Sequence, residues 1–136
     1  MRFFLNTALT FAVMLLPGIS QAAPSEAEIK SKIVGSWSAK AQLGDEYRLV
    51  IRPDGTVNLK AVMPNGKEWG NKNGTWTVKG NKLVFTFVYE KNKSLTTDEE
   101  YDVTSIADNE MNITLQYLID KPLPYTYKKT GPATKP

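Results

Sequence analysis

Apolar and polar residues alternate with a period of two along most of the chain after residue 36. Tyr47, Leu49 and Ile51 occur at every second position, with Arg48 and Arg52 on the other face, and apolar positions recur at every second residue over 111–119. A period of two is that of a β-strand with one buried face and one solvated face. The pattern therefore predicts a chain that is mainly β.

One segment before residue 36 has a helical period instead. Ile29 and Ile33 are four residues apart, and Ser25 followed by Glu28 has the spacing of a capping box. Gly35 then ends the pattern, as glycine does at helix ends. The sequence predicts a short helix in front of the first strand.

Turn residues separate the predicted strands. Pro53, Asp54 and Gly55 predict a hairpin, because proline presets φ and glycine accepts the positive φ of such a turn. Two polar stretches, 65–74 and 90–100, lack a clear alternation and are predicted to be loops or connections. About eight strands remain.

These elements predict a single antiparallel up-and-down β-barrel of about eight strands with a short N-terminal helix. Because no further helices are expected, the apolar face of the sheet must be buried by curling the sheet onto itself. A sandwich of two sheets is the alternative. A barrel of this size has an interior that is filled by side chains or holds one small ligand.

The first residues of the chain have the composition of an export signal. Arg2 precedes an apolar run over 3–16, and small residues stand where a signal peptidase cleaves, which favours cleavage after Ala22. We expect a signal peptide over 1–22 and a protein that is exported, either periplasmic or secreted. The run is short for a membrane span and the chain has no Cys for a lipid, so no membrane anchor is expected.

The rest of the chain has the length of one domain. We expect a barrel domain over 23–130 and a disordered tail over 131–136. Of the 17 basic residues Arg2 belongs to the predicted signal peptide, and the others nearly balance the 14 acidic ones. This scattered charge does not favour a nucleic-acid partner.

The residue types that are missing narrow the chemistry. The chain contains neither His nor Cys, which excludes an imidazole base, a thiolate nucleophile and a histidine metal site. The acidic run Asp98, Glu99 and Glu100 is predicted to be a solvated loop. We therefore expect no enzymatic activity, no metal site and no cofactor.

Several motifs resemble the lipocalin and calycin superfamily. They are Gly35-Ser36-Trp37 after a short helix, the hairpin at Asp54-Gly55-Thr56, and the later stretch from Gly74 to Leu83 with the pattern G-x-W-x-V-x-G-x-x-L. Together they are similar to small bacterial lipocalin-like domains, over roughly 33–129. The resemblance implies an up-and-down barrel in which Trp37 has a structural role, packing across the closed end.

The last strand departs from that family pattern. Lipocalins usually carry an arginine there that stacks on the first-strand tryptophan, whereas this chain offers Lys128 and Lys129. Lysine lacks the planar guanidinium that stacks. The resemblance therefore implies the barrel and the role of Trp37, and it implies no specific ligand.

Aromatic residues on the inward face form the candidate ligand site. A small hydrophobic or aromatic ligand would pack among their rings, with tyrosine hydroxyls to orient it. An ordinary packed core is the alternative. The candidate ligand-binding residues are Tyr47, Trp76, Phe85, Phe87, Tyr101, Tyr117 and Tyr125.

Trp69 supports a different function. It lies in a polar stretch of Gly, Asn and Lys, where a tryptophan favours a partner-binding role, and the alternative is that its ring folds back over the barrel mouth. Two hypotheses follow. The first is an exported lipocalin-like protein that binds a small hydrophobic or aromatic ligand. The second is a protein-binding barrel, an inhibitor or accessory factor, with a packed core and no ligand cavity.

Overall fold

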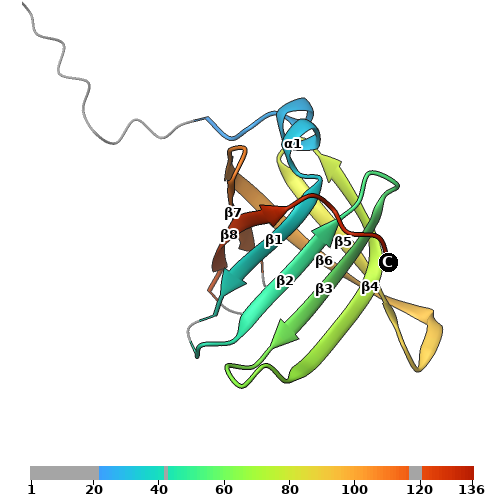
Figure 1. Cartoon of the computed structure of the whole chain (residues 1–136). Helices are drawn as coiled ribbons and strands as arrows, with labels where there is room; N and C mark the ends of the chain where they lie inside the picture. The colour runs from blue at the N-terminus through green and yellow to red at the C-terminus, as the bar shows by residue number, and fades with distance from the viewer. Residues whose placement is uncertain (1–21, 42, 117–120) are drawn as a thin grey trace, which may run out of the picture.

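A computed structural model of the chain describes residues 22–41, 43–116 and 121–136. In these residues eight antiparallel strands form one closed barrel, in which each strand pairs with the next and β8 pairs with β1 (Figure 1). The strands are β1 Gly35–Lys40, β2 Glu46–Ile51, β3 Thr56–Val62, β4 Glu68–Lys79, β5 Lys82–Tyr89, β6 Asn92–Ile106, β7 Glu110–Leu115 and β8 Leu123–Gly131. The predicted up-and-down barrel is confirmed. The predicted signal peptide lies outside the described residues, except for its last position.

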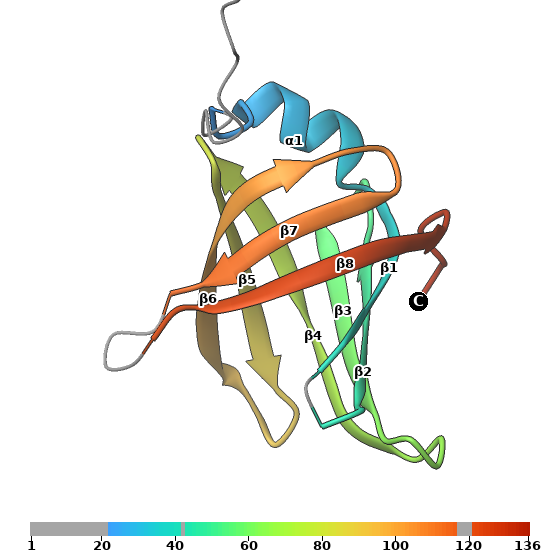
Figure 2. The same ribbon diagram turned by 90° about the vertical axis from the view of Figure 1, so that its left-hand side faces the viewer.

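Helix α1, Glu26–Lys32, lies across one end of the barrel (Figure 2). Ser25 caps it, because the Ser25 Oγ accepts a hydrogen bond of 3.2 Å from the Glu28 amide. Ile29 and Ile33 are fully buried, so the helix contributes its apolar side to the core. The described part of the chain has no helix with the length and apolar character of a membrane span. We call the end covered by α1 the closed end.

Trp37 of β1 is buried at the closed end. Its Nε1 donates a hydrogen bond of 2.9 Å to the carbonyl of Ile33, just after α1. The Nζ of Lys129, on β8, lies 5.0 Å from the centre of the Trp37 ring. Lysine does not stack as a guanidinium does, but its ammonium makes a cation–π contact with the same ring.

The opposite, open end carries the β1–β2, β3–β4 and β5–β6 connections (Figures 1 and 2). The predicted loops over 65–74 and 90–100 are wrong in most of their length, because β4 begins at Glu68 and β6 begins at Asn92. Many side chains of these segments are exposed, so no apolar alternation marked them as strands. Both strands extend toward the open end.

Strands β4 and β5 approach each other very closely at Gly74. A Cβ at that position would lie 1.9 Å from the Thr86 carbonyl oxygen. Only glycine fits such a contact with backbone atoms. On the open side of Gly74 the two strands separate, because their pairing stops at Asn73 and Val88 while Glu68–Lys72 pairs with β3 alone.

The C-terminal segment crosses the outside of the barrel. The Ser36 Oγ donates 2.8 Å to the Pro132 carbonyl, and the Arg52 Nε donates 2.7 Å to the Thr134 carbonyl. The sequence predicts disorder over 131–136. The two hydrogen bonds do not test that prediction.

Candidate functional site

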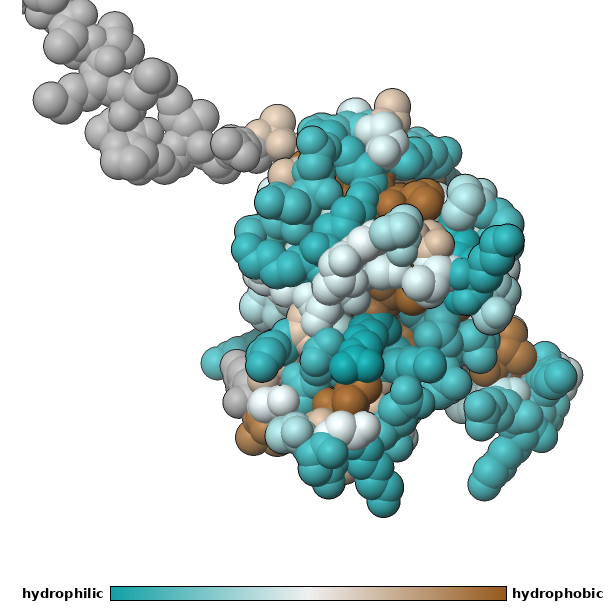
Figure 3. All heavy atoms as spheres, viewed as in Figure 1, coloured by the Kyte–Doolittle hydropathy of each residue, from teal (hydrophilic) through white to brown (hydrophobic). Residues whose placement is uncertain are grey.

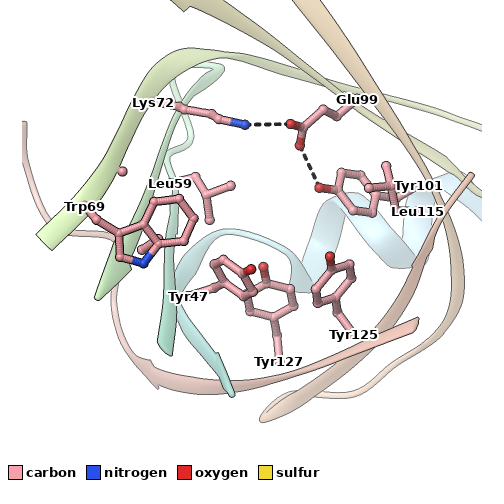
Figure 4. Close-up of a pocket in the computed structure, with 11 residues that line it drawn as sticks. Tyr47, Leu59, Trp69, Lys72, Glu99, Tyr101, Leu115, Tyr125 and Tyr127 are labelled. Atoms are coloured by element: carbon pink, nitrogen blue, oxygen red, sulfur yellow. Dashed lines mark hydrogen bonds and ion pairs between the residues drawn. The ribbon is translucent and has the colours of Figure 1, made fainter. Parts of the chain in front are cut away.

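A cavity of about 180 Å³ lies inside the barrel near its open end (Figure 4). Residues of β2, β3, β4, β6, β7 and β8 line its wall. The lining residues are Tyr47, Leu59, Ala61, Trp69, Gly70, Lys72, Glu99, Tyr101, Leu115, Tyr125 and Tyr127. Aromatic rings therefore make up much of the surface that a ligand would meet.

Four tyrosines form one side of the cavity. The rings of Tyr47 and Tyr125 have centroids 5.8 Å apart at an interplanar angle of 80°, and those of Tyr101 and Tyr125 are 6.4 Å apart at 69°. Tyr127 follows on β8, with its ring centroid 6.3 Å from that of Tyr125. Because the rings of Tyr47 and Tyr101 are strongly inclined to that of Tyr125, they face the cavity from different directions (Figure 4).

A carboxylate and an ammonium group lie on the other side. The Lys72 Nζ is 2.9 Å from Glu99 Oε1, and the Tyr101 hydroxyl donates a hydrogen bond of 2.8 Å to Glu99 Oε2 (Figure 4). Glu99 and Tyr101 are two residues apart on β6 and so share its inward face. Lys72 lies opposite Leu59, another residue of the cavity wall. The described part of the cavity wall thus contains an ion pair among its aromatic rings.

Two of the tyrosines are held in the neutral form. Burial raises the pKa of Tyr101 far above the ordinary tyrosine value, and the negative charge of Glu99 raises it further. Burial also raises the pKa of Tyr127, with smaller contributions from Tyr125 and Tyr47. Both hydroxyls therefore remain protonated at neutral pH and can donate hydrogen bonds.

Two hydroxyls in the cavity wall have no hydrogen-bond partner within the described residues. They are those of Tyr47 and Tyr127. A ligand with a polar group would find donors and acceptors there, because a phenol serves as both. The wall therefore combines apolar surface with a few polar groups, which is the usual composition of a small-molecule site.

The candidate ligand-binding residues divide between this cavity and the rest of the molecule. Tyr47, Tyr101 and Tyr125 line it. Phe85 is buried in the core and packs against Tyr101, with ring centroids 5.4 Å apart. Tyr117 lies outside the described residues.

Two other candidates lie away from the cavity. Trp76 is half-buried toward the closed end, where its Nε1 donates 2.8 Å to the carbonyl of Arg52. Phe87 is buried, and it lines a second hollow of about 230 Å³ on the side where β4 and β5 separate. Lys72 lines both hollows, so it stands between the cavity and this side opening.

Trp69 lies in strand β4 and not in a loop, which corrects the prediction for its segment. Its side chain is 57% exposed and also lines the cavity. The Nε1 donates a hydrogen bond of 3.2 Å to Asp45 Oδ2 in the β1–β2 connection. The ring therefore borders the cavity mouth.

Sequence reasoning missed the two charged residues of the cavity. The run 98–100 is predicted to be a solvated loop. It lies in strand β6 instead, where Asp98 and Glu100 are exposed as expected but Glu99 faces inward. Glu99 is two residues before Tyr101, and Lys72 is four residues before Trp76, so the period of two places each on the inward face. This periodicity could have identified both residues as inward-facing. They were not identified, because charged residues are normally expected on the outer face.

The described residues contain no group of three or more His, Cys, Asp or Glu side chains placed to hold a metal ion. Comparisons with protein-family models, with curated proteins and with solved structures found no significant match to the chain.

Proposed function

We propose that the protein is an exported, lipocalin-like binding protein that holds one small ligand with a hydrophobic or aromatic body at the open end of its barrel. The observation that carries this proposal is the cavity walled by Tyr47, Tyr101, Tyr125 and Tyr127. The other end of the barrel is occupied by α1 and the buried Trp37. A ligand would therefore enter through the open end.

The size of the cavity limits the ligand. An apolar cavity of about 150 Å³ binds benzene, and the cavity here measures about 180 Å³. A single ring with a short substituent fits such a space, whereas a long-chain lipid would extend far beyond the mouth. The proposed ligand is therefore a small aromatic or compact aliphatic molecule.

The proposal includes the cellular location and the mode of action. The predicted signal peptide over 1–22 supports binding outside the cytoplasm. The lack of His and Cys, together with the pairing of Glu99 to Lys72 and Tyr101, supports binding without catalysis. We therefore propose a carrier or scavenger and not an enzyme.

A cavity-filling variant tests this proposal. Gly70 lines the cavity, and a Cβ there would lie 3.5 Å from the Ala61 Cβ, an ordinary contact. Gly70→Leu should therefore fill the cavity while the barrel remains folded. The matched control is Thr77→Leu, at an exposed position of the same strand. Calorimetric titration with phenethyl alcohol should show binding to the native protein and the control, and none to Gly70→Leu. Equal binding by all three proteins would contradict the proposal.

A specific observation favours protein binding as a second candidate function. The exposed large apolar side chains of the described residues all lie toward the open end, where Figure 3 shows hydrophobic patches on a largely hydrophilic surface. These residues are Leu43, Met63, Trp69, Val88, Tyr89, Leu95 and Leu123. Such a rim suits the contact surface of an inhibitor or accessory factor.

The second candidate has its own test. Leu95 is 54% exposed on the β5–β6 hairpin and does not line the cavity. Leu95→Ser should abolish co-purification of a host partner, while Thr104→Ser, at an exposed position of β6, should retain it. If the same proteins co-purify with both variants, this rim is not the binding surface.

A further inference from the structure

We infer that the ligand of this cavity is a small organic ammonium with an aromatic or apolar body, and that its charge pairs with Glu99. This inference rests on the proposed function and adds the chemical class of the ligand. It follows from three features of the site: a fixed carboxylate, a displaceable lysine and a surrounding set of aromatic rings. The carboxylate is on β6, the lysine is on β4, and the rings come from β2, β6 and β8.

Glu99 is the fixed charge of the cavity. Its side chain is only 19% exposed, and the Tyr101 hydroxyl holds Oε2 at 2.8 Å. Tyr101 is itself buried and packed against Phe85, so this anchor has little freedom to move. A carboxylate in such surroundings needs a positive partner, because an unpaired buried charge is costly.

Lys72 provides that partner in the structure, but its side chain is the more exposed member of the pair. It is 52% exposed, and its Nζ lies 2.9 Å from Glu99 Oε1. The same Nζ is 5.4 Å from the centre of the Phe87 ring, and the residue borders the side hollow as well as the cavity. When a ligand arrives, the lysine can turn toward that hollow and solvent at small cost. It then leaves Oε1 free for the ligand.

The tyrosine rings complete a site for an ammonium group. Cations bind over the faces of aromatic rings at about 6 Å or less from the ring centre, and aromatic cages recognise organic ammonium ions in this way. Tyr47, Tyr101 and Tyr125 border the cavity at steep mutual angles. The Lys72 ammonium already lies near both a carboxylate and an aromatic ring. The ligand ammonium would take over the contact with the carboxylate.

An anionic ligand fits the same geometry less well. It would pair with the Lys72 ammonium. Because the Glu99 Oε1 lies 2.9 Å from the Lys72 Nζ, the anion would then lie close to the Glu99 carboxylate. Glu99 cannot withdraw, because its backbone is in β6 and its Oε2 is bonded to the buried Tyr101. Like charges at short range repel. The exposed lysine can be displaced and the anchored carboxylate cannot, so the site selects a cation.

Three probes of nearly equal shape separate charge from size. They are phenethylammonium, phenethyl alcohol and phenylpropionate, titrated into the full folded barrel by calorimetry at neutral pH and low salt. We expect phenethylammonium to bind about tenfold or more tighter than the alcohol, and the carboxylate to bind weakest. Tightest binding by phenylpropionate would overturn the inference.

Two single substitutions distinguish an electrostatic role from a structural one. Glu99→Gln keeps the shape of the side chain and should weaken phenethylammonium about tenfold or more, with little change for phenethyl alcohol. Lys72→Gln removes the competing ammonium and should strengthen phenethylammonium by about threefold or more. Circular dichroism and thermal unfolding show whether both variants fold. Loss of phenethylammonium binding in Lys72→Gln would contradict the displacement of the lysine.

The outcomes also separate this inference from the proposed function. If phenethyl alcohol binds in a manner that Gly70→Leu abolishes, but phenethylammonium binds no better, the cavity is a ligand site and the inference about charge is wrong. If none of the three probes binds, the inference and the proposed small-molecule function both fail. Tight phenethylammonium binding that is sensitive to Glu99→Gln and to Gly70→Leu supports both.

Discussion

The Nζ of Lys129 lies 5.0 Å from the centre of the Trp37 ring and donates a hydrogen bond of 3.2 Å to the carbonyl of Lys32. Trp37 is on β1 and Lys129 is on β8, so this contact joins the two strands that close the barrel. The hydrogen bond also reaches the last residue of α1. One side chain thus connects the helix, the first strand and the last strand at the closed end.

Lys129→Met should therefore destabilise the barrel. The substitution keeps most of the apolar stem but removes the cation–π contact and a charged hydrogen bond, for an expected loss of about 1–2 kcal/mol. Lys129→Arg should retain most of the stability, because a guanidinium also binds aromatic faces. The control is Lys128→Met, whose ammonium pairs with Glu110 at the surface and should matter less. Chemical denaturation measures all three, and equal losses at 128 and 129 would refute the role of Lys129.

Ile29→Ala should reduce stability without affecting the ligand site. Ile29 is fully buried where α1 packs on the closed end, and truncation of such a residue costs about 2–5 kcal/mol. The cavity is at the other end of the barrel, so a variant that remains folded should bind phenethyl alcohol with unchanged affinity. Urea unfolding and calorimetric titration provide the two measurements. A parallel loss of affinity would mean that the closed end shapes the cavity.

Two glycines of β4 should differ strongly in how much stability the same substitution costs. Gly74→Ala places a Cβ against the Thr86 carbonyl oxygen, where the backbone has no room, and should cost about 3 kcal/mol or more. Gly70→Ala places its Cβ 3.5 Å from the Ala61 Cβ and 4.0 Å from the Ala61 nitrogen, both ordinary contacts, and should change stability by less than about 1 kcal/mol. Thermal unfolding of both variants tests the contrast. Similar melting temperatures would show that the strands do not approach each other at Gly74 in this way.

The raised pKa of Tyr101 and of Tyr127 predicts alkaline sensitivity. An unfolded tyrosine loses its proton near pH 10, whereas these two keep theirs in the folded state. Their contribution is thus fully present below about pH 10 and decreases above it, by about 1.4 kcal/mol per pH unit for each group. Denaturant unfolding at about pH 8 to about pH 11, a range that spans the ordinary tyrosine pKa, should show this decrease in the free energy of unfolding. Tyr101→Phe and Tyr127→Phe should each flatten it, and an unchanged slope in both would be inconsistent with burial of the hydroxyls.

The architecture of the barrel could be predicted because its central strands obey simple alternation. In β7 the buried residues Met111, Ile113 and Leu115 occur at every second position, and the β2–β3 turn has strong hairpin residues. The role of Ser25 as the N-cap of α1 could also be predicted from the sequence. The strands over 68–72 and 92–98 could not be found in this way, because exposed side chains occupy both of their faces.

The candidate site was predicted only in part, for a physical reason. Tyr47, Tyr101 and Tyr125 follow the apolar alternation and were found, although Trp76 and Phe87 follow it too and lie elsewhere. Residues sharing a face are placed along the barrel axis by register, which a single sequence does not give. Charged residues that face inward, such as Glu99, contradict the pattern that defines the interior.

The most direct test of the central claim is an NMR titration of the protein with isotope-labelled tyrosine rings and tryptophan indoles, using phenethylammonium and phenethyl alcohol as ligands. We predict that the ring signals of Tyr47, Tyr101, Tyr125 and Tyr127 shift with saturable dependence on ligand, and that the indole of Trp69 shifts with them. The indole of Trp37, at the closed end, should not move. Shifts that spare these four tyrosines, or the absence of any saturable shift, would contradict a ligand site at the open end.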